Sequence, residues 1–471
     1  MHNTLREEGR QQAFTIEETY VKEEEVRQRQ LASVETDEEK SRISRELNLL
    51  REDRVQYYQR LRELSMPEAM RERMEAQSNR SVESSQVPLQ LPEGSEAQAE
   101  FYRTMREDII SEITGVLESS RAVEQHPEDP KALAARALGL ALAGHYEEAL
   151  ADFSRSLQLR PEDPNALHNR GNALLYLERY QEALADFNHS LELRPDYPDT
   201  LYNRGTALLA LNRYPEALAN FNRSLELQPD EPATLNNRGI TLRLLERYPE
   251  ALADFNCSLE VRPDDPATLY NRGNTLVYLE RYPEALTNYN RSLELYPDRP
   301  DTLSNRGIAL AHLQNYQESL NDFNRSLELR PDDTATLDNR GTTLTHLERY
   351  PEALADYNRS LALGPDHPET LNNRGVVLQY LERYEEALQD YTRALELRPD
   401  YADTLYNMAC LRSLTGNYED ALQWLERAVA GEAKYRQKAI EDKDFAPLRD
   451  HPEYGPRFQQ LIAGDSGEAE Q

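Results

Sequence analysis

The sequence predicts an all-α protein, a solenoid built from antiparallel helix pairs, and a single periodic pattern carries most of that prediction. From residue 130 to residue 435 the chain repeats itself every 34 residues, nine times, without insertion or deletion. Glycine, alanine and proline each recur at a fixed phase of this period, as at Gly171, Ala183 and Pro195. A constant period of this length means that each unit packs mainly on its neighbours. Such a fold presents a long surface.

The unit over residues 164–197 shows why each repeat should form two helices. In its first half, apolar residues such as Leu167 and Leu174 follow the three- and four-residue spacing of one helix face. A second run contains Phe187, and Pro195 ends it because proline cannot continue a helix. Four units also have proline in the first turn of the second helix, where its missing N–H is tolerated. These prolines are Pro215, Pro249, Pro283 and Pro351.

This spacing resembles the tetratricopeptide repeat family, whose signature includes Gly in the first helix, then Ala, Phe and Pro, on a period of 34. Gly171 and Phe187 match that signature. The chain departs from it with Leu in place of the first Trp, with Arg170 in place of Leu, and with Ser190 in place of the usual Ala. The resemblance covers about two thirds of the chain. It implies a right-handed superhelix whose first helices line a concave groove, and a protein that binds proteins or peptides there.

The residues before and after the nine repeats fall into segments of different amino-acid composition. Atypical ends are expected in a solenoid, because a terminal repeat must cover an apolar face. We expect a charged, partly helical arm at 1–75, a linker at 76–95, a degenerate capping repeat at 96–129, nine repeats at 130–435, capping helices at 436–463 and a disordered tail at 464–471.

The arm contains a short apolar pattern. Its residues could form a coiled-coil seam that gives weak self-association through residues 45–65, although fewer than three clean heptads are present. The alternative is a charged arm without a seam. The residues of the pattern are Leu47, Leu50, Tyr57, Leu61 and Leu64.

Charge and composition limit the classes of partner. The formal net charge of −31 argues against binding a nucleic acid, which needs stripes of Lys and Arg. No apolar stretch reaches the length of a membrane span, and the first 30 residues lack the apolar core of a signal peptide. Cys257 and Cys410 lie in different repeats, too far apart for a disulfide in an extended array. We therefore expect a cytoplasmic protein that does not insert into membranes.

A row of asparagines is the strongest candidate for a binding site. Counted from the residue that opens each repeat, the sixth position is Asn in eight consecutive repeats. A side-chain amide can pair with both the N–H and the C=O of an extended peptide. The row resembles the asparagine ladder of the O-linked N-acetylglucosamine transferase superhelix, another member of the repeat family. Alternatively, the amides bridge neighbouring helices. The row is Asn169, Asn203, Asn237, Asn271, Asn305, Asn339, Asn373 and Asn407.

Tyrosines add apolar contact area to the same predicted groove, where Tyr is a common binding residue. Alternatively, they contact the next helix. Tyr176, Tyr278 and Tyr380 hold the thirteenth position, and Tyr202, Tyr270 and Tyr406 hold the fifth. Arg243 is the only basic residue at the twelfth position, and positions five, nine and thirteen have none, so a two-carboxylate clamp is not expected.

An arginine and an aspartate that both recur with the period predict a structural ion pair between packed helices. Arg recurs at position seven, as at Arg170 and Arg238, and Asp recurs at position 23, as at Asp186 and Asp254. Asn-x-Ser triplets also recur at one phase, and we interpret them as by-products of the repeat. They begin at Asn188, Asn222, Asn256, Asn290, Asn324 and Asn358.

The sequence contains no P-loop, dinucleotide fingerprint, CxxC pair or HExxH motif. His312 and His346 share a phase in adjacent repeats, but no further ligands lie at suitable spacing, so no metal or cofactor is expected. We expect a non-enzymatic scaffold that binds protein or peptide segments in the groove. One alternative is a regulatory or substrate-recruiting subunit of an enzyme complex that makes contact through residues 1–95. A less favoured alternative is an RNA-binding helical repeat. The partner's identity, the pathway and the oligomeric state are not encoded in these patterns.

Overall fold

The computed structural model describes residues 122–142 and 144–463, and within these residues it contains helices and turns but no strand. The chain divides into two compact units, residues 1–193 and 194–471. The arm at 1–75, its proposed seam at 45–65, the linker at 76–95, most of the capping repeat at 96–129 and the tail at 464–471 lie outside the described residues.

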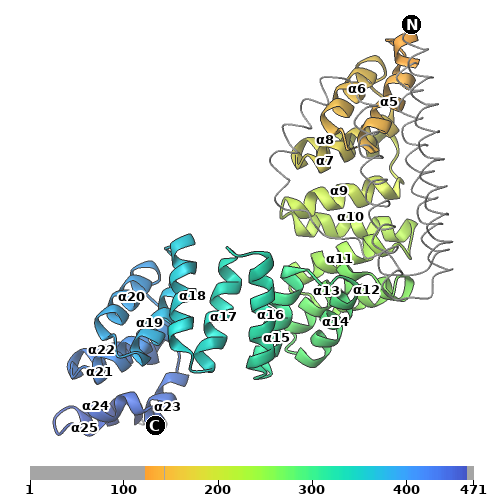
Figure 1. Ribbon diagram of the computed structural model, residues 1–471. Helices are drawn as coiled ribbons and strands as arrows, with labels where there is room; N and C mark the ends of the chain where they lie inside the picture. Colours follow the sequence, from red (N-terminus) through yellow and green to blue (C-terminus); the bar gives the residue numbers. More distant parts are fainter. Residues whose placement is uncertain (1–121, 143, 464–471) are drawn as a thin grey trace, which may run out of the picture. The chain divides into compact units, whose positions relative to one another are not determined.

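Each repeat is a pair of helices, as the period predicts (Figure 1). The first helices are α5 (Pro130–Leu142), α7 (Pro164–Tyr176), α9 (Pro198–Ala210), α11 (Pro232–Leu244), α13 (Pro266–Tyr278), α15 (Pro300–His312), α17 (Thr334–His346), α19 (Pro368–Tyr380) and α21 (Ala402–Leu414). The second helices are α6 (Tyr146–Leu159), α8 (Tyr180–Leu193), α10 (Tyr214–Leu227), α12 (Tyr248–Val261), α14 (Tyr282–Leu295), α16 (Tyr316–Leu329), α18 (Tyr350–Leu363), α20 (Tyr384–Leu397) and α22 (Tyr418–Gly431).

Within each unit, a second helix packs against its own first helix and against the first helix of the next repeat. In the second unit this makes neighbours of α15, α16, α17 and α18 in chain order (Figure 1). The predicted all-α solenoid of helix pairs is therefore confirmed.

The periodic glycine allows an aromatic ring to pack directly on the first helix. A Cβ atom added to Gly273 would lie 2.6 Å from Cε1 of Tyr289, a ring with no exposed surface. Helical glycine costs roughly 1 kcal/mol relative to alanine. Close packing of a buried aromatic ring outweighs that cost, which explains why the glycine recurs. The same relationship holds at Gly171, Gly205, Gly239, Gly307, Gly341 and Gly375.

The turn between the two helices of a repeat has left-handed backbone geometry. Glu280 has φ +57°, and the next residue, Arg281, donates its N–H to the carbonyl of Leu276 at 2.9 Å, which closes the end of the first helix. Glycine is the residue best suited to this conformation. The first and last repeats do have glycine there, Gly144 and Gly416, each with positive φ.

The predicted ion pair between packed helices is confirmed. Arg238 donates from Nε and Nη2 to the two carboxylate oxygens of Asp254, at 2.7 and 2.6 Å. The same pairing joins Arg136 to Asp152, Arg170 to Asp186, Arg306 to Asp322, Arg340 to Asp356 and Arg374 to Asp390.

Side chains of the Asn-x-Ser triplets form hydrogen bonds that recur with the period, both within a repeat and between repeats. Arg238 also donates from Nη1 to Asn222 Oδ1 of the preceding repeat, at 3.0 Å. In five of the triplets the serine donates to the carbonyl that opens its own repeat, as Ser258 does to Pro232 at 3.1 Å. This bond also accounts for Ser190, which donates to Pro164 at 2.9 Å. The asparagine and the serine of a triplet therefore each form a hydrogen bond that recurs at the same place in the repeat.

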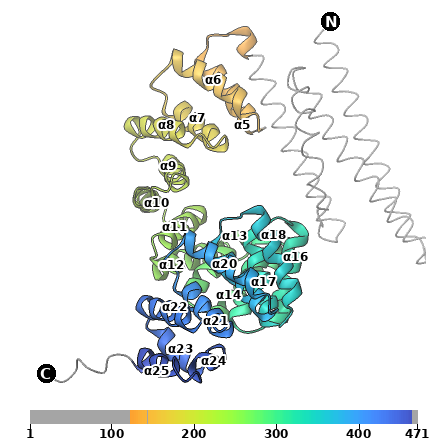
Figure 2. The same ribbon diagram turned by 90° about the vertical axis from the view of Figure 1, so that its left-hand side faces the viewer.

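Beyond the last repeat, the chain packs back on α21 and α22 as α23 (Lys434–Glu441), η1 (Lys443–Phe445), α24 (Ala446–Arg449) and α25 (Gly455–Ala463) (Figures 1 and 2). Five side chains of this segment are at most 1% exposed: Tyr435, Ala439, Phe445, Leu448 and Phe458. At the other end, Val123 is buried against Ala132 and Leu133. No helix within the described residues is long and apolar enough to cross a membrane.

Candidate functional site

We call positions 5, 6, 9, 12 and 13 of the first helices the first-helix face. In the second unit, from residue 198 to residue 401, this face has only two charged side chains, Arg243 and Asp338. The rest are amides, hydroxyls, aromatic rings and aliphatic groups. Because 30% of the whole chain is charged, this face differs from the rest of the sequence.

The asparagine row joins consecutive repeats. Asn305 donates from Nδ2 to the hydroxyl of Tyr270 at 3.0 Å, and Asn237 donates to that of Tyr202 at 3.1 Å. In each pair the acceptor lies at position five of the preceding repeat. At these positions the asparagines therefore bridge neighbouring repeats, which is the alternative stated above.

Where position five is asparagine, a side-chain carbonyl replaces the hydroxyl. Asn271 donates to Asn236 Oδ1 at 3.0 Å, and Asn407 donates to Asn372 Oδ1 at 3.0 Å. These partners at position five were missed from sequence. The sequence pattern that could have revealed them is a polar residue 35 positions before each asparagine. This pattern can be recognised only when the register between repeats is known.

These bonds determine what the row can offer a ligand. Asn305 uses Nδ2 twice, because it also donates to Asn274 Oδ1 at 2.8 Å. An amide nitrogen has two hydrogens, so the remaining group of Asn305 is its carbonyl oxygen. All eight asparagines of the row are neither fully buried nor fully exposed. The row can therefore present hydrogen-bond acceptors to the N–H groups of an extended segment.

The tyrosines at position 13 each stack on a tyrosine of the preceding repeat. The ring centroids of Tyr278 and Tyr248 are 5.3 Å apart, with an interplanar angle of 8°. Tyr278 is nevertheless 59% exposed. Tyr278 therefore contacts the preceding repeat and still has exposed surface that a partner could contact. Tyr176 on Tyr146 and Tyr380 on Tyr350 repeat this arrangement, and His312 and His346 stack on Tyr282 and Tyr316.

The tyrosines at position five are not equivalent. Tyr202 and Tyr270 are half-buried, and each accepts the amide hydrogen bond described above. Tyr406 is only 1% exposed, because Tyr435 stacks on it at 4.8 Å and Phe445 packs against its edge. The prediction that Tyr406 lies on an open groove is therefore wrong. The C-terminal segment covers the first-helix face at the last repeat.

Arg243 lies on this face without a counter-charge from the part of the chain that the structure describes. Its guanidinium carbon is 5.9 Å from the ring centroid of Tyr278, and it forms no ion pair among the described residues. Its Nε is buried and has no hydrogen-bond acceptor. The other charged group, Asp338, accepts from Thr370 at 2.6 Å. Burial raises the pKa of the Asp338 carboxyl.

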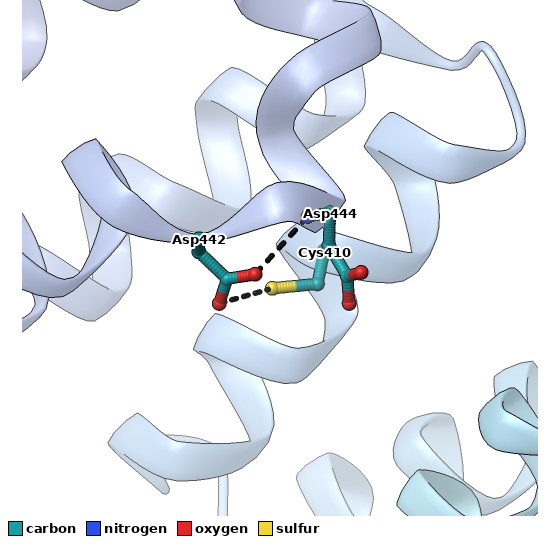
Figure 3. Close-up of side chains that lie close together, drawn as sticks. All are labelled: Cys410, Asp442 and Asp444. Carbon is teal, nitrogen blue, oxygen red and sulfur yellow. Dashed lines mark hydrogen bonds between the residues drawn. The ribbon is translucent and has the colours of Figure 1, made fainter.

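A cluster at the C-terminal end brings together three groups that can bind metals. Ligand atoms of Cys410, Asp442 and Asp444 lie within 4.8 Å of one another (Figure 3). Both carboxylates already accept hydrogen bonds, from Tyr406 and Gln379 respectively, each at 2.7 Å. Burial raises the pKa of the Cys410 thiol, which disfavours the thiolate that a metal needs. The cluster instead ties the C-terminal segment to the last two repeats. Both cysteines are free thiols.

A tetratricopeptide repeat model matches residues 162–230, 230–298, 332–399 and 366–431, and a second matches 274–338. A TPR repeat model matches residues 140–177. The chain belongs to the tetratricopeptide repeat family. TPR proteins generally act as scaffolds for protein interactions. No curated protein matches the chain.

The chain is also similar to several solved structures, each at low sequence identity. The TPR protein YrrB, described as having an unusual peptide-binding site, is 23% identical over 39% of this chain and 95% of its own, with a TM-score of 0.34. A TPR protein from Parabacteroides merdae is 20% identical over 50% and 93%, with a TM-score of 0.42. Cut9–Hcn1 of the APC/C is 17% identical over 62% and 57%, with a TM-score of 0.45. The likeness to the O-linked N-acetylglucosamine transferase ladder stays a hypothesis.

Proposed function

We propose that this chain is a non-catalytic scaffold that binds an extended segment of a partner protein along the first-helix face between residues 198 and 401. The observation that carries this proposal is the chemistry of the face. Side-chain amides repeat along an almost uncharged surface, inside a chain with a net charge of −31. If this surface served only to keep a long solenoid soluble, its positions would be charged like the rest of the exterior.

The spacing of the row suits an extended backbone. Packed helices lie about 8–10 Å apart, and an extended chain rises about 3.3 Å per residue. One asparagine can therefore meet the segment at about every third residue. The carbonyl oxygen of Asn305 would accept a backbone N–H, while the exposed ring of Tyr278 would contribute apolar contact area.

A triple substitution of Asn237, Asn271 and Asn305 to Ala tests the proposal. Because these amides also join repeats, the variant needs a control that loses comparable bonds elsewhere. Asn222, Asn290 and Asn324 provide it, since each accepts a hydrogen bond from an Arg of the next repeat, Arg238, Arg306 and Arg340 respectively. The control triple changes the same residue type and the same kind of contact between repeats.

The probe is a library of random peptides of about twelve residues, the length that spans about four repeats. We expect the full chain to select peptides, the control triple to bind them as the wild type does, and the first-helix-face triple to bind them at least about tenfold more weakly. If both triples bind equally, or if no peptide is selected, the proposal is wrong.

A cytoplasmic location belongs to the same proposal. Cys257 is an exposed free thiol, which agrees with a reducing compartment. Fractionation of cells that produce the full chain tests this, and recovery of the protein outside the cytoplasm would contradict it.

A further inference from the structure

One basic side chain interrupts the neutral first-helix face. Among positions 5, 6, 9, 12 and 13 between residues 198 and 401, Arg243 is the only Lys or Arg. Other arginines of the second unit contact carboxylates: Arg238 pairs with Asp254, and Arg247 pairs with Glu250. Arg243 has no such partner among the described residues.

The surroundings of Arg243 leave its charge uncompensated. Its Nε is buried and lacks an acceptor, which is unfavourable for a group that donates strongly in water. The residue is only partly buried, and Nε is its one nitrogen that is buried without a partner, so we infer that the terminal nitrogens can reach a ligand. Tyr278 lies beside the guanidinium and Tyr289 interacts with its charge, and neither residue supplies a carboxylate.

The same place has the composition of a binding hot spot. Tyr278 is 59% exposed, stacks on Tyr248 with one face, and lies beside the Arg243 guanidinium. Tyr and Arg dominate the residues that contribute most to protein–protein affinity. We call Arg243, Tyr248 and Tyr278 the Arg243 patch.

Resting on the function proposed above, we propose that the Arg243 patch selects partner segments with an acidic side chain, Asp or Glu, at the residue that passes over Arg243. The carboxylate would accept hydrogen bonds from the terminal guanidinium nitrogens, the strongest pairing available to arginine. The first-helix face is uncharged in the repeat before Arg243 and in the two repeats after it, so it would favour an otherwise uncharged segment there.

The position of Arg243 in the middle of the row indicates that the recognised acid is a side chain of the partner segment and not its terminal carboxylate. Asparagines of the row are present in the repeats on both sides of it, at Asn203 and at Asn271 and Asn305. A segment that follows the row therefore continues past Arg243 in both directions. Recognition of a terminal carboxylate would also need further donors, and positions 5, 9 and 13 have no Lys or Arg.

The test uses peptides that the full-length wild type selects from the random library, with affinities measured by fluorescence anisotropy. We expect the selected peptides to share Asp or Glu at one position. Changing that acid to its amide should weaken binding by about tenfold or more, and Arg243→Gln should weaken binding of the acidic peptide equally. Arg243→Gln should not weaken binding of the amide peptide further, because the contact is already lost.

Arg247→Gln is the matched control, since Arg247 is an exposed arginine in the same repeat whose partner Glu250 lies outside the first-helix face. It should leave both affinities unchanged. The thermal midpoint of Arg243→Gln should stay close to that of the wild type, because Arg243 forms no ion pair among the described residues and its contact with the Tyr278 ring is long, at 5.9 Å.

The outcomes separate this inference from the proposed function. Selected peptides that depend on the asparagine row but share no acidic position, or whose acid preference survives Arg243→Gln, overturn the inference alone. Loss of the acid preference when the peptide C-terminus is amidated also overturns the inference. The recognised acid would then be the terminal carboxylate and not a side chain. Failure to select any peptide overturns the proposed function together with it.

Discussion

Arg238 and Asp254 are joined by two parallel hydrogen bonds across the two helices of one repeat, at 2.7 and 2.6 Å. The Asp254 carboxylate is 7% exposed and the Arg238 side chain is 25% exposed, so water competes weakly for the pair. In two repeats the position of the aspartate is taken by asparagine, Asn220 and Asn288. At the first of these, Arg204 Nε still donates to the amide oxygen at 2.6 Å.

We expect Asp254→Ala to lower the free energy of unfolding by about 2–3 kcal/mol, because Arg238 would remain partly buried without its carboxylate. Asp254→Asn should lower it less, as Asn220 provides the same acceptor naturally. Asp264→Ala is the control: it removes an exposed pair with Arg291 and should change stability by about 0–1 kcal/mol. Urea denaturation measures all three. Equal stability of Asp254→Ala and wild type would contradict a structural role.

Gly273→Ala should destabilise the protein by about 1–2 kcal/mol. The new methyl group would meet the buried ring of Tyr289 at 2.6 Å, and the strain of overpacking exceeds the gain of roughly 1 kcal/mol in helix propensity. Gly364→Ala is the control, because nothing lies within 4 Å of its added Cβ atom. The thermal midpoint should fall for Gly273→Ala only. Larger side chains at residue 273 should lower it further.

Glu280→Gly should stabilise the protein by about 0.5–1 kcal/mol, although it removes a side chain. Glu280 has φ +57°, a conformation that costs an L-residue with a Cβ atom roughly 1 kcal/mol or more. Glu280→Ala keeps the strain and removes the charge, so it should not raise the thermal midpoint. A stabilisation shared by both variants would show that charge, and not backbone strain, is responsible.

Stability should fall as pH rises above about 10, partly through Tyr357. Burial raises the pKa of its phenol from 10.0 to about 12. Below pH 10 the group is neutral in both the folded and unfolded states. Between pH 10 and 12 only the unfolded state ionises, so the unfolded state gains stability. The loss of folding free energy over that window is about 2–3 kcal/mol.

Tyr357→Phe should reduce this alkaline loss while costing about 1 kcal/mol at neutral pH through the lost bond to Thr342. Tyr296→Phe is the control, since Tyr296 is 62% exposed. Denaturation followed at pH 8 and at pH 11 compares the variants. An identical pH dependence of Tyr357→Phe and wild type would contradict the assignment to this residue.

Much of the fold follows from short-range patterns. The three- and four-residue spacing of Leu167 and Leu174, ended by Pro195, predicts a helix pair from local geometry alone. The Arg238–Asp254 pair was also predictable, since two opposite charges repeating together inside a packed array must be matched. In each case the partners belong to one repeat, and the period sets their relative position.

Other features of the site depend on groups that are distant in sequence. Asn305 was expected to offer both a donor and an acceptor, but the hydroxyl of Tyr270, 35 residues earlier, takes part of its donor capacity. Tyr406 occupies the same phase as Tyr270, yet it is buried because residues 434–463 pack back onto the last repeat.

The repeat, its helices and the residues that share a face can therefore be predicted from the amino-acid sequence, because a fixed period places equivalent residues at equivalent points. Which polar groups of that face remain available follows from the packing, because availability depends on the register between repeats and on the segment that covers the last one. Arg243 illustrates the difference: its rarity is visible in the sequence, while its lack of a counter-charge is visible only in the packed structure.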